Sequence, residues 1–271
     1  MKVRFLMLSV LAVVLVTVNS CKKSTSAGET AELSTEVQNQ IAALGFSADG
    51  AYATDGGYIV ENDIFVSKDD LQQGQMNLQN TLQVGDEEQY HTTNLVTGLP
   101  RLIKISVSSQ LPSNYVTAVD NAIARYNARN LQLTFSRVSS GANISILKAP
   151  SNAQYLASSG FPTNNGNPYN QVLVNSTAIG NSSSSTWVNY CASIIAHEVG
   201  HCIGFRHTDY MNRAYSCGGS AVNEGSAGVG AIHIPGTPTN PDPNSWMLAC
   251  ISNLQNRPFN SNDVIALNYL Y

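Results

Sequence analysis

Charged side chains are scarce in this chain: Lys, Arg, Asp and Glu make up 12% of its 271 residues, and the formal net charge is −4. It contains no block of basic residues, so no nucleic-acid partner is expected. The first twenty residues hold two of the fourteen basic residues and no acidic one, which leaves 12 minus 18, or −6, on the remainder. Anionic polymers are therefore poor candidates for a substrate.

Long hydrophobic runs are missing except near the start, where residues 5–18 are apolar. That run is shorter than a membrane-spanning helix, which needs about 20 apolar residues. Lys2 and Arg4 precede this apolar run. The stretch at its end, Val18-Asn19-Ser20-Cys21, resembles a bacterial lipobox. We therefore predict a lipoprotein signal peptide at residues 1–20 and a lipid anchor on Cys21. The protein would then be an exported bacterial lipoprotein of the cell envelope, at the outer membrane or cell surface. Ordinary secretion with an incidental cysteine is the alternative.

Cysteine is also rare, with five in the chain. After Cys21 an even number remains, which in an exported protein indicates two disulfides among Cys191, Cys202, Cys217 and Cys250. Cys191 and Cys202 cannot pair if both lie on one helix, because eleven residues span roughly 16 Å there. Two connectivities remain, of which we favour 202–217 with 191–250. The alternative is that these cysteines are free structural thiols.

One stretch is rich in metal ligands: the pattern H-E-x-x-H-x-x-G-x-x-H is formed by His197, Glu198, His201, Gly204 and His207. On a helix His197 and His201 leave the same face one turn apart, where both can bind one small cation. Gly204 permits a positive φ that ends the helix and brings His207 in as a third ligand. Three nitrogens with one open position are typical of a catalytic site with one Zn²⁺.

This stretch resembles the zinc-binding signature of the metzincin metallopeptidases. The run His207-Thr208-Asp209 and residues 58–64 are similar to the bacterial dual-action HEIGH metallopeptidase family. The resemblance implies a methionine turn beneath the metal, for which Met247 is the candidate, and a closing helix in residues 259–271. It also implies an extended substrate along the free edge of a strand near residues 171–177. Residues 248–258 would line the pocket for the side chain after the scissile bond, with an apolar preference.

The predicted fold class is α+β: a metzincin-like (zincin) catalytic domain with a twisted mixed sheet, a zinc helix and a C-terminal helix, preceded by a small N-terminal segment. The catalytic domain would occupy residues 96–271, and residues 21–95 would be a tether with a pro-like or accessory segment. Ser185 or Thr186 is expected to cap the zinc helix. Apolar periodicity predicts helices at 33–44 and 111–129, and strands at 51–54, 58–66, 101–108, 131–137, 143–148 and 171–177.

The function that these residues favour is that of a zinc-dependent endopeptidase acting on a protein or peptide substrate. Glu198 is placed to take a proton from a water at the metal as general base. Two alternatives stay open: a surface lipoprotein that binds a peptide or polymer, and a zinc hydrolase that acts on cell-wall peptides. The intact Glu198 argues against the first, because a purely structural metal site needs no base.

Glu61 and Asp63 lie in a short stretch of the N-terminal segment that is flanked by apolar residues. An anionic oxygen is an acceptable zinc ligand, so one of these carboxylates could fill the open zinc position and keep an enzyme silent. The alternative is that residues 58–66 form an ordinary strand with both acids in solvent.

Overall fold

The computed structural model of the chain describes residues 33–74, 89–226, 228, 230–238 and 240–271. The predicted signal peptide and Cys21 lie outside these ranges. The described residues all belong to one compact unit, Ala31–Tyr271. Across the ranges that are described, no helix is both long and apolar enough to cross a membrane.

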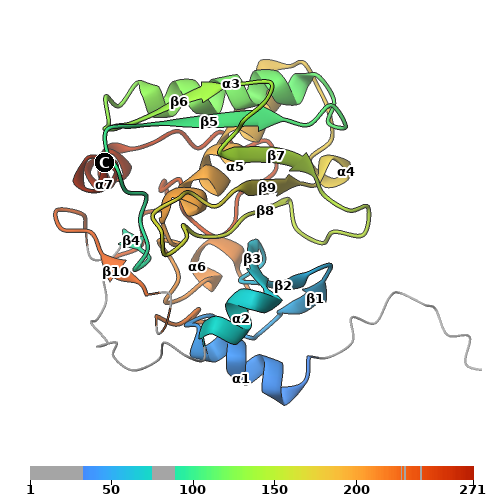
Figure 1. The fold of residues 1–271 in the computed structure, drawn as a ribbon, viewed down its shortest axis with the longest axis vertical. Coiled ribbons are helices and arrows are strands. Elements are labelled where there is room, and N and C mark those ends of the chain that lie inside the picture. Colours follow the sequence, from blue (N-terminus) through green and yellow to red (C-terminus); the bar gives the residue numbers. More distant parts are fainter. Residues whose placement is uncertain (1–32, 75–88, 227, 229, 239) are drawn as a thin grey trace, which may run out of the picture. The chain divides into compact units, whose positions relative to one another are not determined.

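A five-stranded mixed sheet forms the frame of the fold, in the order β6-β5-β7-β9-β8 (Figure 1). Its strands are β5 (Arg101–Val107), β6 (Leu133–Arg137), β7 (Ile144–Lys148), β8 (Ala157–Ser158) and β9 (Gln171–Val174). The first four strands in this order run parallel, and β8 pairs antiparallel with β9. The expected free edge at residues 171–177 is therefore wrong, because β8 covers it. Only two residues long, β8 shows no periodic pattern that the sequence could reveal.

Two helices, α3 (Asn114–Asn127) and α5 (Ser185–Ile203), pack against each other. Helix α3 contacts β5 and β6, and α5 contacts β8 and β9, so together they cover the sheet. The main core lies between these layers and includes Ile103, Tyr126, Val172 and Ile195. Helix α5 is capped by Ser184, whose side chain accepts from the backbone N–H of Trp187, rather than by the predicted Ser185 or Thr186. The short helix α4 (Ser176–Ile179) precedes it.

The N-terminal segment builds a small layer of its own from α1 (Thr35–Ala43), β1 (Tyr52–Thr54), β2 (Gly57–Val60), β3 (Ile64–Ser67) and α2 (Lys68–Gly74). Strands β1, β2 and β3 form an antiparallel sheet, and Ile41, Val60 and Ile64 belong to its core. The predicted strand at 58–66 is interrupted by a tight turn at residues 61–63. Glu61 and Asn62 adopt positive φ angles of 53° and 77° there.

The remaining elements are β4 (Tyr90–His91), α6 (Ala214–Cys217), β10 (Ile232–His233) and α7 (Ser261–Leu270). Strand β4 pairs with β10. Helix α7 begins with a capping box in which Asn260 and Asp263 exchange hydrogen bonds with each other's backbone. The predicted α+β fold, with a mixed sheet, a long histidine-bearing helix and a closing C-terminal helix, is confirmed.

The predicted disulfide pairing is wrong. Cys217 bonds to Cys250, with their Cα atoms 5.1 Å apart, and Cys191 and Cys202 are buried free thiols. An even number of cysteines does not require that all of them pair. Cys191 and Cys202 both lie on α5 within the main core, where burial raises the pKa of each thiol. The alternative of free structural thiols therefore holds for this pair alone.

Candidate metal centre

Helix α5 and the turn that follows it bring the three predicted histidines together. The Nε2 atom of His201 lies 3.0 Å from Nε2 of His197 and 3.2 Å from Nε2 of His207. Gly204, with φ 113°, makes the reversal between the helix and His207. A Cβ at Gly204 would lie 2.7 Å from the Leu95 side chain and 2.9 Å from the carbonyl of Asn94, so no larger residue fits.

The other ring nitrogen of each histidine is held by an oxygen. Nδ1 of His197 lies 2.9 Å from the carbonyl of Trp246, and Nδ1 of His201 lies 2.7 Å from that of Phe205. Nδ1 of His207 lies 3.1 Å from both carboxylate oxygens of Glu224. These acceptors favour a proton on each Nδ1, which leaves each Nε2 lone pair free to bind a metal.

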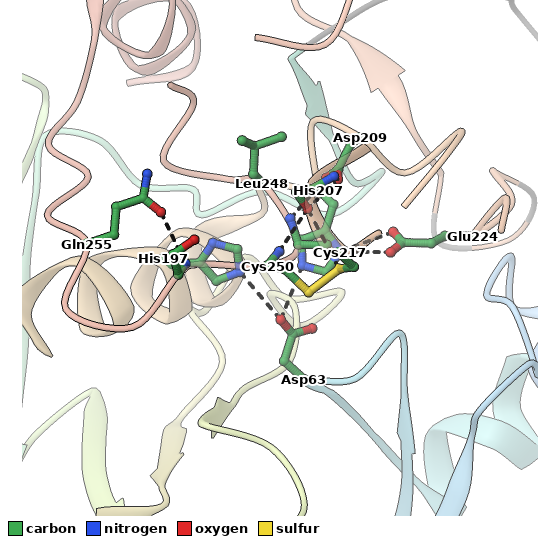
Figure 2. The surroundings of a disulfide bond; sticks show 12 residues. Asp63, His197, His207, Asp209, Cys217, Glu224, Leu248, Cys250 and Gln255 are labelled. Atoms are coloured by element: carbon green, nitrogen blue, oxygen red, sulfur yellow. Dashed lines mark hydrogen bonds and ion pairs between the residues drawn. A yellow bond between two sulfur atoms is a disulfide. The ribbon is translucent and has the colours of Figure 1, made fainter. Parts of the chain in front are cut away.

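Asp63 completes the cluster from the turn between β2 and β3. Its Oδ2 lies 3.3 Å from Nε2 of His207 and 3.6 Å from Nε2 of His197 (Figure 2). The ligand atoms of these four buried residues, His201 included, all lie within 4.8 Å of one another. In the described part of the chain, Oδ1 of Asp63 is buried and has no hydrogen-bond partner. Three nitrogens and one carboxylate oxygen at this spacing fit a tetrahedral zinc ion.

The electrostatics of the cluster also fit a cation. Burial opposes the charged form of His207, but Glu224 and Asp63 outweigh it and raise its pKa well above the ordinary value. Burial likewise opposes ionisation of Asp63, but the flanking histidines hold the pKa of that carboxyl below its usual range. Burial and the two neighbouring imidazoles lower the pKa of His201. The buried carboxylates of Asp63 and Glu224 thus lie next to three imidazoles. A divalent ion bound there would balance the two negative charges of these carboxylates.

Glu198 faces the same cluster and is held by a residue that the sequence did not reveal. The Ser159 hydroxyl donates to Oε2 of Glu198 at 2.6 Å. Both residues are buried, and burial together with the Asp63 carboxylate raises the pKa of Glu198 well above its ordinary value. Ser159 follows β8 directly, so the edge of the sheet fixes the position of this carboxylate.

Met247, the candidate for the methionine turn, packs against helix α5. A Cβ built on Gly200, which lies between the two helical histidines, would be 2.7 Å from Sδ of Met247 and 2.8 Å from the Trp246 ring. The backbone N–H of Thr208 donates to the carbonyl of Met247, which ties this turn to the chain just after His207. The turn therefore packs directly against the helix between the metal-facing side chains.

A cavity of about 370 Å³ opens beside Glu198 and His197. Its wall includes part of the segment predicted to line a substrate pocket: Leu248, Ala249, Cys250, Ile251 and Arg257. Tyr155, Leu156 and Ala157, from β8 and the residues before it, form another side, and Asn62 and Asp63 border it as well. The cavity thus joins the edge of the sheet to the metal-facing carboxylates.

Glu224, Ser159 and the disulfide partner of Cys217 are the features that sequence reasoning missed. Glu224 follows His207 by 17 residues in a loop that carries no periodic pattern. Asp209 explains the disulfide, because it accepts from the Ser216 hydroxyl and from the backbone N–H of Ala249. It thereby holds Ser216 and Ala249, the residues just before Cys217 and Cys250, close together.

Comparison with known proteins gives a family match and likenesses to solved structures. The model of the family described as dual-action HEIGH metallo-peptidase matches residues 58–271. A solved structure of myroilysin is similar over 66% of this chain and 96% of its own, with a TM-score of 0.42 and 15% sequence identity. No curated protein matches the chain. The family match begins at Tyr58, in strand β2 of the N-terminal layer.

Proposed function

Starting from the finding that the chain belongs to the dual-action HEIGH metallopeptidase family, we propose that it is a zinc endopeptidase in which Glu198 is the general base. In this proposal His197, His201 and His207 hold one Zn²⁺. The observation that carries it is the convergence of three oriented Nε2 atoms beside a buried glutamate at the mouth of a cavity. The family supports a metallopeptidase acting on a protein or peptide; the zinc, the base and the residue roles are our inference.

Bound zinc would supply a Lewis acid for the scissile carbonyl and lower the pKa of a water to about 7. Glu198 takes a proton from the attacking water and delivers it to the leaving amine. Its raised pKa, caused by burial, suits both tasks. Ser159 keeps the carboxylate in place by donating to Oε2. Met247 contacts no substrate in this scheme and packs beneath the histidines as an apolar floor.

The substrate would lie extended along β8, whose outer edge takes the place predicted for residues 171–177. The side chain after the scissile bond would enter the cavity of about 370 Å³. Leu248 and Ile251 favour an apolar stem in that cavity, while Arg257 brings a buried guanidinium to its wall. The buried guanidinium leads us to replace the apolar preference expected from the sequence by a preference for long side chains that end in an oxygen, such as glutamate or glutamine. A peptide-library cleavage profile that excludes both residues at this position would contradict that preference.

The test combines metal analysis with peptide cleavage. We expect about one zinc per chain, lost in His201→Ala and kept in Glu198→Gln, whose casein cleavage should fall by ~10²–10⁴-fold. Cleavage is measured in the wild-type chain and in Asp63→Asn, because Asp63 lies beside the histidine nitrogens. Peptidoglycan serves as the competing substrate. Zinc-loaded protein that cleaves casein in neither background, or full activity in Glu198→Gln, would contradict the proposal.

We also propose that the protein is an exported lipoprotein anchored through Cys21. The support is the sequence alone, since residues 1–32 lie outside the described ranges. Cys21→Ser should abolish fatty-acid labelling and move the protein from the membrane fraction to the soluble one. Labelling that persists in this variant would rule the anchor out.

A further inference from the structure

We propose that the β2–β3 hairpin is a built-in inhibitor of the metal centre, with Asp63 in the coordination position that a catalytic water would use. The inference rests on the proposed function, because it concerns how the same site is kept inactive. Asp63 is 8% exposed, and its Oδ2 lies within 3.6 Å of two histidine Nε2 atoms. A carboxylate oxygen is a good zinc ligand, so it would close the position that a catalytic zinc keeps open.

The backbone of the hairpin also occupies the sheet edge that a substrate would need. The N–H of Phe65 donates to the carbonyl of Ser159 at 2.6 Å, and the N–H of Ser159 donates to the carbonyl of Asp63 at 3.0 Å. Ile64 and Ser159 form a parallel bridge. The hairpin thus extends the sheet beyond β8, next to the residue that positions Glu198. An extended substrate and the hairpin cannot use these backbone groups together.

A buried ion pair anchors the hairpin to the histidine turn itself. The Arg206 guanidinium, one residue before His207, donates to both oxygens of Glu61 at 3.1 and 3.2 Å. Arg206 is fully buried, with its guanidinium 5.2 Å from the centre of the Phe46 ring. Glu61 and Phe46 both belong to the N-terminal layer. Arg206 therefore binds that layer through an ion pair with Glu61 and through a cation–π contact with Phe46.

The turn that presents Asp63 is strained in a way that fits a functional role. Glu61, at φ 53°, lies in the left-handed region, which is unfavourable for a non-glycine residue. The conformation points Glu61 toward Arg206 and, two residues later, Asp63 toward the histidines. The strained turn thus brings Glu61 to Arg206 and Asp63 to the histidines. Backbone strain of this kind is typical of functional sites, where the local conformation does not serve stability.

The test uses the full chain loaded with Co²⁺, whose visible spectrum reports its ligands, and acetohydroxamate as a probe of the open position. Asp63→Asn should bind acetohydroxamate at least tenfold more tightly than wild type and change the cobalt spectrum. The matched control is Asp55→Asn, which alters an exposed aspartate in the β1–β2 turn and should match wild type in both readouts. Glu61→Gln, which loosens the anchor and keeps Asp63, should raise hydroxamate affinity by a smaller factor.

Two results would overturn the inference: equal hydroxamate affinity in wild type, Asp63→Asn and Glu61→Gln, or an unchanged cobalt spectrum in Asp63→Asn. Casein cleavage separates this inference from the proposed function. Tighter hydroxamate binding by Asp63→Asn without casein cleavage supports the inhibitory hairpin and contradicts the endopeptidase. Equal casein cleavage by wild type and Asp63→Asn supports the endopeptidase and contradicts the hairpin's role.

Discussion

The two sides of the metal centre are built differently. The histidine side comes from one helix and its terminal turn, and every ring is oriented by an oxygen of the surrounding core. The hairpin side reaches the same point through Asp63, which lies 197 minus 63, or 134, residues before His197. It is held by backbone hydrogen bonds to Ser159 and one buried ion pair. This contrast underlies our proposal of a histidine metal site that the hairpin covers.

The largest expected effect on folding stability comes from the covalent bond on the histidine side. Replacing both Cys217 and Cys250 by alanine should lower the free energy of unfolding by about 3–4 kcal/mol, because the bond closes a loop with a sequence separation of 33. Urea denaturation measures the change. The matched control, Cys191→Ala, removes a buried sulfur but no cross-link and should cost about 1 kcal/mol. If the two proteins lose equal stability, the disulfide does not stabilise this side.

A smaller effect is expected from the acceptor behind His207. Glu224→Gln should weaken zinc binding by about 10–100-fold, because the amide is a poorer partner for the ring N–H of a metal-bound histidine. Competition with a chelator of known affinity measures this loss. Glu61→Gln is the comparison, since it alters the other carboxylate beside Arg206 and should leave zinc affinity within a few-fold. Similar losses of zinc affinity in both variants would contradict the claim that only the histidine side determines zinc binding.

The smallest effect concerns Ser159, which touches both sides. Ser159→Ala removes a hydrogen bond to the Glu198 carboxylate and should lower kcat about tenfold, equivalent to about 1.4 kcal/mol. Zinc content and KM should stay near wild type, because the hydroxyl contacts no histidine nitrogen in the described structure. Measuring kcat and KM separately in the Asp63→Asn background checks this. A change confined to KM would mean that Ser159 serves substrate binding instead.

The sequence predicts the histidine side of the metal centre better than the hairpin side. The histidines, Glu198 and Met247 are brought together as predicted, because helix periodicity and one glycine reversal place most of them. The sequence also singled out Glu61 and Asp63, but it did not reveal the turn that separates their roles. Glu224, Ser159 and the Cys217–Cys250 bond depend on loops whose paths are set by tertiary contacts, such as those of Asp209. Local patterns carry no information about such contacts.

Zinc affinity in three proteins tests the contrast most directly: wild type, His201→Ala and Asp63→Asn, each measured by chelator competition. A permanent histidine site with a removable carboxylate predicts at least a thousandfold loss in His201→Ala and no more than about a tenfold loss in Asp63→Asn, with one zinc per chain retained. If Asp63→Asn loses as much affinity as His201→Ala, the carboxylate is an obligatory fourth ligand. The centre would then be a closed structural zinc site, and the hairpin would be part of it rather than a removable cover.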